Sequence, residues 1–214
     1  MSVTGICLIL FLTFHCCMNV AAFFSGDAYN TICAFLGANW YAIAGSIGLA
    51  VLAVCHIVFA FILTAQNRRA RGEQRYEVTS RRPEVSWASQ NMLVLGIIIL
   101  LGIGLHLYNF WYHMQFAEIA GMDVMPAPQD GFGWIKLTFA NPVFSVLYLV
   151  WICAIWFHLS HGFWSAMQTL GWSGKIWLKR WQCIGLVYVT ILMAVFAFLV
   201  ISFWLGFAPS MCNA

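Results

Sequence analysis

Five long apolar stretches occupy most of this 214-residue chain, and they constrain its fold more than any other feature. They cover about residues 3–24, 41–65, 91–112, 143–168 and 183–207. Each is long enough to cross the roughly 30 Å hydrocarbon core of a bilayer as a helix rising about 1.5 Å per residue. The pattern predicts an all-α membrane protein, a single domain over residues 1–214 built as a bundle of five transmembrane helices in a lipid bilayer.

The composition excludes several classes of protein. Hydrophobic residues make up 63% of the chain and charged residues 8%, against about 45–50% and about 25% in soluble domains. A soluble enzyme, a disordered tail and a nucleic-acid binder are therefore excluded, and a net charge of +3 is too small for a nucleic-acid surface. The first apolar stretch has no basic segment before it and is too long for a signal peptide, so we interpret it as a membrane helix.

The charged residues lie between the apolar stretches and predict an orientation. The positive-inside rule places the two basic links in the cytoplasm, with the N-terminus inside and the C-terminus outside. The other two links are acidic, which agrees with the same alternating topology. The basic links carry Arg68, Arg69, Arg71, Arg75, Arg81 and Arg82, then Lys175, Lys179 and Arg180; the acidic links carry Asp27, Glu118, Asp123 and Asp130 against Lys136 alone.

The eight cysteines do not indicate a disulfide framework or a covalently attached haem. Six of them lie in apolar stretches, where cysteine behaves as a small hydrophobic residue. The sequence has no Cys-x-x-Cys pair and no Cys-x-x-Cys-His motif, which argues against c-type haem, zinc and iron–sulfur sites.

Four histidines lie deep within the predicted spans: His15, His56, His106 and His158. An ionisable residue at such a depth is costly and indicates a functional site. Counted from the cytoplasmic end of each span, His15 and His106 are about 18–22 Å deep, and His56 and His158 are about 14–15 Å deep. The four therefore form an outer pair and an inner pair, each contributed by two helices.

Helical bundles bind haem iron between two opposed imidazoles, one from each of two helices. Zinc, copper and non-haem iron also bind imidazole but usually need three or four clustered ligands, so two b-type haems fit the spacing better. Gly102 and Gly162, each one turn from a deep histidine, either make room for a porphyrin edge or let helices pack closely. His113 lies seven residues beyond His106, at the outer interface, and His161 is an alternative ligand to His158.

These residues resemble a known family, the dihaem cytochrome b anchor subunits of succinate dehydrogenase and quinol:fumarate reductase with five helices. The most specific match is residues 157–165, Phe-His-Leu-Ser-His-Gly-Phe-Trp-Ser, which are similar to the family's F-H-x-S-x-G-x-W-S segment. Residues 13–15 (Thr-Phe-His), residues 56–59 (His-Ile-Val-Phe) and the nineteen-residue spacing from Trp87 to His106 are also similar.

The resemblance implies a function, cofactors and partners. In the family, four histidines are the axial ligands of two haems b. The matching residues here are His15 with His106 for one haem and His56 with His158 for the other. The chain would be the membrane electron-transfer subunit of a quinone-linked respiratory enzyme, without a flavin or dicarboxylate site of its own. A flavoprotein and an iron–sulfur subunit would bind on the cytoplasmic side of a bacterial inner membrane. A membrane quinone, expected to be menaquinone, would be the substrate, and a dimer of complexes is implied.

The chain departs from the family at three places. The basic segment that usually precedes the first helix is not present before Met1, which leaves Ser2 as the candidate propionate contact at that end. Trp156 stands where some relatives have a glutamate, and Ala60 where some have glycine.

Haem propionates and a quinone both need polar partners at the ends of the bundle. For each candidate the alternative interpretation is a solvated surface side chain. The inner candidates are Ser2, Ser89, Gln90, Lys175, Lys179 and Arg180, and the outer ones are Asn19, Asn30, Asn109, His113 and Glu118.

Two other functions remain open at this point. One is the dihaem cytochrome b subunit of another respiratory complex, such as a nitrate reductase, formate dehydrogenase or hydrogenase, although those anchors distribute their ligands differently. The other is a transporter or a non-haem iron enzyme, which needs clustered histidines near one face of the membrane.

Overall fold

The computed structural model describes residues 1–71 and 87–207, and all regular secondary structure in those ranges is helical. Five helical segments in them are long and apolar enough to cross a membrane, which confirms the prediction of a five-span, all-α membrane protein. The segments are Ser2–Phe23, Trp40–Ala70, Met92–Ala120, Pro142–Thr169 and Lys175–Trp204.

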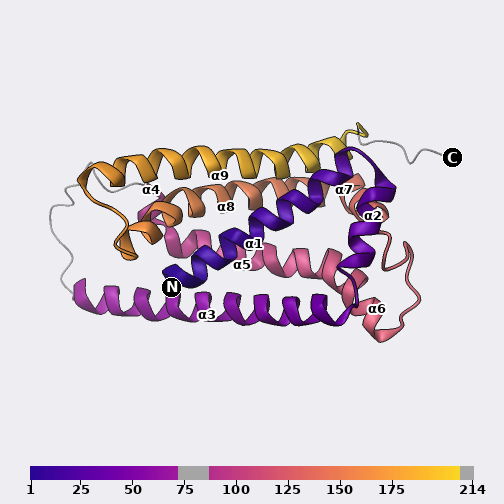
Figure 1. Cartoon of the computed structure of the whole chain (residues 1–214), viewed down its shortest axis with the longest axis horizontal. Coiled ribbons are helices and arrows are strands. Elements are labelled where there is room, and N and C mark those ends of the chain that lie inside the picture. The colour runs from indigo at the N-terminus through magenta and orange to yellow at the C-terminus, as the bar shows by residue number, and fades with distance from the viewer. Residues whose placement is uncertain (72–86, 208–214) are drawn as a thin grey trace.

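The spans alternate in direction along one long bundle (Figure 1). The first consists of α1 (Ser2–Val20) and the 3₁₀ turn η1 (Ala21–Phe23), and the second is α3 (Trp40–Arg71). The third runs through α5 (Met92–His106), the π-helix η2 (Leu107–Phe116) and α6 (Ala117–Ala120). The last two are α8 (Pro142–Thr169) and α9 (Lys175–Trp204), and the shorter helices are α2 (Gly26–Phe35), α4 (Trp87–Gln90) and α7 (Gly131–Ala140).

Several boundaries differ from the prediction. Helix α9 begins at Lys175 rather than near residue 183, and α3 continues to Arg71 rather than ending near residue 65. Lysine and arginine shorten an apolar stretch but are good helix formers, so the helices extend past the hydrocarbon. The predicted link 113–142 is largely helical, since it holds the end of η2 together with α6 and α7.

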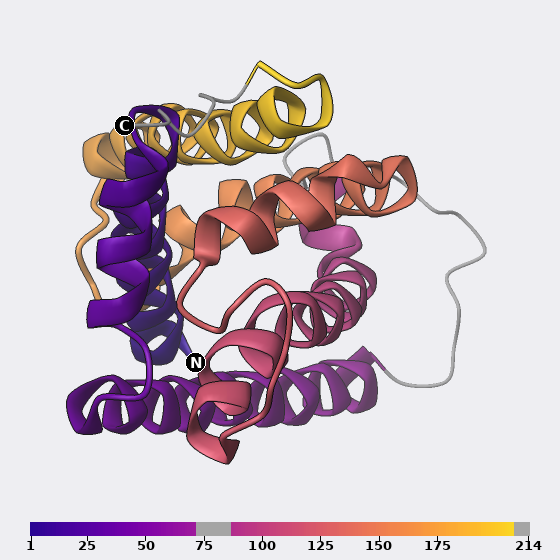
Figure 2. The same ribbon diagram turned by 90° about the vertical axis from the view of Figure 1, so that its right-hand side faces the viewer.

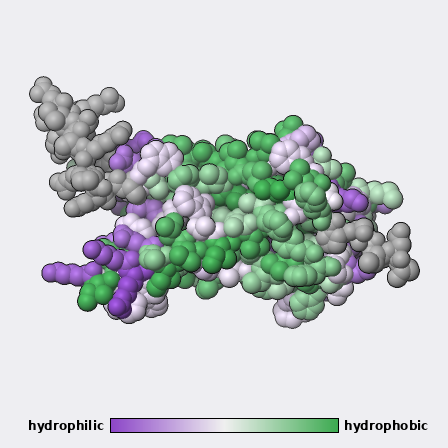
Figure 3. Space-filling view, turned by 90° about the horizontal axis from the view of Figure 1, so that it is seen from above, coloured by the Kyte–Doolittle hydropathy of each residue, from purple (hydrophilic) through white to green (hydrophobic). Residues whose placement is uncertain are grey.

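Charged residues separate to the two ends of the bundle. The N-terminus, the end of α3 and the start of α9 lie at one end, here called the inner end (Figure 1). Helices α2, α6 and α7, with all four acidic residues of the described chain, lie at the other, the outer end. Hydrophobic residues cover much of the surface between polar ends (Figure 3). Arg75, Arg81 and Arg82 fall outside the described residues.

Close approach at glycines holds the central helices together. Gly185 of α9 lies against the ring of Phe163 on α8, and Gly102 of α5 lies against the indole of Trp151 on α8. The Trp151 indole N–H also donates to the carbonyl of Ile99, at 3.1 Å. For Gly102 the structure thus supports close helix packing, one of the two alternatives that the sequence left open.

Helix α3 is the most loosely attached span. It packs chiefly on α1, and none of the residues in its most apolar window is buried. An end-on view places α3 at the edge of the bundle, opposite α9 (Figure 2). The seven cysteines of the described ranges are free thiols.

The contact at Gly102 makes a stability prediction. A Cβ at this position would overlap the Trp151 ring, whereas a Cβ at Gly104 would meet no other atom within 4 Å. We expect Gly102→Ala to lower the free energy of unfolding in detergent by about 1–3 kcal/mol. Gly104→Ala is the matched control and should be neutral or slightly stabilising. Equal thermal unfolding of the two variants would contradict the packing role.

Candidate functional site: two histidine pairs

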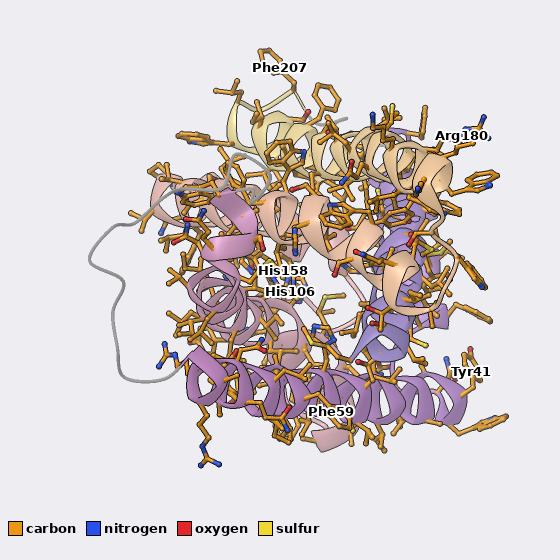
Figure 4. The ribbon with its side chains drawn as sticks, turned by 90° about the vertical axis from the view of Figure 1, so that its left-hand side faces the viewer. Tyr41, Phe59, His106, His158, Arg180 and Phe207 are labelled. Atoms are coloured by element: carbon orange, nitrogen blue, oxygen red, sulfur yellow. The ribbon has the colours of Figure 1, made fainter. Side chains whose placement is uncertain are left out.

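The structure brings the four deep histidines together as two pairs, each joining two helices. His15 on α1 faces His106 on α5, with ring centroids 5.8 Å apart and ring planes at 86°. His56 on α3 faces His158 on α8, with centroids 6.4 Å apart and planes at 68°. These are the pairs that the depth count predicts. His106 and His158 point into the interior of the bundle, whereas Phe59 lies at its periphery (Figure 4).

The spacing of each pair fits a metal ion held between two imidazoles. A metal–imidazole bond is about 2 Å long and the ring centroid lies roughly 1 Å behind the nitrogen, so opposed ligands have centroids about 6 Å apart. The observed 5.8 Å and 6.4 Å lie near this separation, and they are also within the range of about 4.5–7 Å for direct edge-to-face contact between rings. The Nδ1 atoms of His106 and His158 are buried without a hydrogen-bond partner, so each pair holds an imidazole with an unused nitrogen.

Each pair offers two imidazole rings as possible donors. Over residues 1–71 and 87–207, no three His, Cys, Asp or Glu side chains form a group that could hold a metal ion. Zinc, copper and non-haem iron usually need such a group. Haem iron needs only two axial ligands, because the porphyrin supplies the other four donors.

Aromatic side chains enclose the outer pair. Rings from α1, η2, α8 and α9 lie within 6.2 Å of its two imidazoles, measured between centroids. A shell of this kind limits the access of water and lowers the local dielectric constant, both of which tune a metal site. The rings are Phe11 and Phe196 beside His15, and Phe110, Tyr148 and Trp151 beside His106.

A short series of hydrogen-bonded side chains leads from the outer end of the bundle to the outer pair. The buried Asn19 amide donates to the His15 carbonyl at 2.8 Å and lies 3.4 Å from His15 Nε2. The Tyr29 hydroxyl of α2 donates to Asn19 Oδ1 at 3.1 Å. Burial raises the pKa of Tyr29 well above its ordinary value, so the hydroxyl stays neutral and remains a donor. Asn19 is one of the predicted outer candidates, whereas Tyr29 is not among them.

The start of α1 lies against the inner pair. The Thr4 hydroxyl is 3.1 Å from His56 Nδ1, and a Cβ at Gly5 would lie 3.4 Å from His56 Cε1. Thr4 is not among the residues predicted from the sequence, although its position carries a signal. Thr4 precedes His15 by eleven residues, which is about three full helical turns, so both residues lie on one face of α1.

The other two histidines lie apart from the pairs. The His161 ring packs on Trp164, with centroids 4.8 Å apart, and it is His158 that faces His56. His113 lies at the outer end, as predicted, in the π-helix η2. Its ring is 4.7 Å from that of Trp134 on α7, and its Nδ1 is 2.8 Å from the Tyr108 carbonyl. The sequence did not predict a π-helix, which often occurs at functional sites.

Glu118 ties segments of the outer end together. Its Oε2 accepts a hydrogen bond from the Ala38 backbone N–H at 3.1 Å, and its Oε1 accepts one from Gln129 Nε2 at 2.8 Å. Both carboxylate oxygens are therefore engaged in joining α6 to the chain before α3 and to the chain before α7.

Gln115 is a second residue at the outer end that hydrogen-bonds to several segments, and it is not among the residues predicted from the sequence. This buried amide donates to the Gly37 carbonyl at 2.9 Å. Its Oε1 accepts from the Ser46 hydroxyl at 2.7 Å and from the Trp111 indole at 2.9 Å. A buried amide must satisfy its polar atoms, but the sequence does not reveal that the partners come from three segments.

The remaining candidates divide between the two ends. Asn30 donates to Asp130 at 2.8 Å and accepts from the Phe132 backbone N–H at 2.8 Å, so it joins α2 to α7. The inner candidates all lie at the inner end, nearer the His56–His158 pair: Ser2 begins α1, Ser89 and Gln90 lie in α4, and Lys175, Lys179 and Arg180 lie in the first turns of α9.

Comparison with known proteins adds no assignment. The chain matches no protein-family model, no curated protein and no solved structure.

The two bonds of Glu118 predict a structural effect. We expect Glu118→Ala to lower the free energy of unfolding by about 1–3 kcal/mol, because the Ala38 and Gln129 donors lose their acceptor. Thermal unfolding, with proteolysis of the outer loops, measures the change. Asp123→Ala removes an exposed carboxylate from the same end and should have little effect. Equal stability of the two variants would contradict the role.

Proposed function

We propose that this chain is the dihaem cytochrome b anchor of a succinate dehydrogenase or fumarate reductase complex. The observation that carries the proposal is the pair of cross-helix histidine contacts, at 5.8 Å and 6.4 Å between centroids. The segment at residues 157–165, which resembles the family's fourth-helix motif, contains one of the four histidines.

Each residue has a defined task in this proposal. His56 and His158 would bind the inner haem, and His15 and His106 the outer one. Bound haem supplies reversible one-electron transfer. The chain supplies two imidazoles at each of two depths, and an aromatic enclosure at the outer pair that excludes water.

The partners follow from the two ends of the bundle. The inner end presents the exposed cations Lys175, Lys179 and Arg180, and the positive-inside rule places it in the cytoplasm. The flavoprotein and iron–sulfur subunits would bind there. The membrane quinone would react at the outer end, with the protein in a bacterial inner membrane.

His113 is the outer residue best suited to proton exchange with a quinol. Its Nδ1–H donates to the Tyr108 carbonyl, which leaves the Nε2 lone pair as the acceptor. Glu118 is less suited, because both of its oxygens already accept hydrogen bonds. A general base must reach the proton that it removes, and in this proposal Nε2 of His113 would be the accepting atom.

Single histidine variants test the haem assignment. The purified full chain should contain about two b-type haems, measured by reduced-minus-oxidised spectra and pyridine haemochrome. His56→Ala and His158→Ala should each weaken binding of the same haem, while His15→Ala and His106→Ala should each weaken binding of the other, because each pair would supply both protein ligands to one iron.

His161→Ala is the control, since it removes a neighbouring imidazole outside the pairs, and it should retain both haems. A colourless wild-type protein would overturn the proposal and favour a transporter or non-haem iron enzyme. Copurification with a molybdenum or nickel protein would instead indicate another respiratory complex.

The proton role of His113 makes a separate prediction. His113→Ala should slow electron transfer from a quinol by about 100-fold or more, the range typical of general-base catalysis, and should leave both haems in place. Stopped-flow reduction of the haems by a quinol measures this rate, and reduction by dithionite is the control. Unchanged quinol kinetics with His113→Ala would exclude it as the proton acceptor.

A further inference from the structure

One side chain outside the four histidines makes a directed contact with the inner pair. The Thr4 hydroxyl lies 3.1 Å from His56 Nδ1 and donates to the Met1 carbonyl at 2.7 Å. The contact with His56 joins the first turn of α1 to the middle of α3, the span with the fewest packing partners, while the bond to Met1 stays within the start of α1.

Counting hydrogens determines the direction of the contact. A threonine hydroxyl has one hydrogen, and here the Met1 carbonyl accepts it. Toward His56 the Thr4 oxygen therefore offers only a lone pair, so the hydrogen between them belongs to His56 Nδ1. A neutral imidazole carries one hydrogen, which leaves Nε2 of His56 with a free lone pair.

The two bonds also restrict the orientation of both side chains. A hydrogen bond from threonine Oγ1 to the carbonyl three residues earlier selects one of the two χ1 rotamers open to Thr in a helix. Gly5, the next residue, lets the His56 ring lie directly against α1, because a Cβ there would already contact Cε1 at 3.4 Å. The ring is therefore held at its Nδ1 edge.

We propose that Thr4 is a positioning residue that fixes the tautomer and orientation of His56, so that Nε2 is the metal-binding atom of the inner site. This inference rests on the proposed function. Partners of this kind orient metal-ligating histidines and raise their basicity. His158 Nδ1 has no hydrogen-bond partner, so the hydrogen-bonded orientation within the pair comes from the start of α1, where the Thr4 hydroxyl and the Met1 backbone both interact with His56.

Three variants of the full chain test the proposal. Thr4→Val removes the hydroxyl at nearly constant volume, and Thr4→Ser retains it without the methyl group. Thr13→Val is the matched control, because Thr13 also lies on α1, donates to the carbonyl four residues earlier and bonds a side chain of another helix, Tyr188, instead of a histidine.

Inner-haem affinity and midpoint potential are the readouts, and the outer haem of the same molecule is the internal reference. Thr4→Val should lower inner-haem affinity by about ten-fold or more, the usual effect of losing such a partner. It should also raise the inner midpoint potential, because a less basic imidazole stabilises oxidised iron less. Thr4→Ser should restore both values, and Thr13→Val should change neither.

Each contrary result has a definite meaning. A wild-type protein without haem would overturn the proposed function and this inference together. Two haems in the wild type with an unchanged inner site in Thr4→Val would overturn the inference alone. The same would follow if Thr4→Ser were as defective as Thr4→Val, or if Thr4→Val lost both haems equally, because either result would indicate packing of α1.

Discussion

An imidazole inside a bilayer is costly to place, and the arrangement of this bundle turns the rings of its four deep histidines toward one another. Water cannot solvate a ring at such a depth, and leaving a polar atom unpaired there is costly. The four deep histidines face each other in two pairs rather than facing lipid. The Nδ1 atom of His56 has the Thr4 hydroxyl as a partner, whereas the Nδ1 atoms of His106 and His158 have no hydrogen-bond partner.

The two ends of the bundle meet different demands. At the outer end, Gln115, Glu118 and Asn30 bind short segments that are far apart in sequence. The aromatic rings around His15 and His106 enclose the outer pair. The inner end is cationic and exposed, and the start of α1 is the part that approaches the inner pair.

Much of the architecture was predictable because a membrane helix has a nearly constant rise. Hydropathy located the five spans, and counting residues along them paired His15 with His106 and His56 with His158. The start of α9 at Lys175 was missed because charge ends an apolar stretch without ending a helix. Helices α2 and α7 were missed because ten residues are too few to give a hydropathy signal, and a π-helix has no such signal.

The sequence by itself determined the number of spans and the depth of each histidine, because the rise per residue leaves little freedom along a helix axis. Rotation about that axis and the distance between helices were decided only by tertiary packing, as where Gly102 admits Trp151 and Gly185 admits Phe163. A hydrogen bond requires the rotation of each helix and the distance between the helices to place donor and acceptor within a fraction of an ångström of the right separation. The contact of Thr4 with His56 and the two bonds of Glu118 therefore became visible only in the folded bundle.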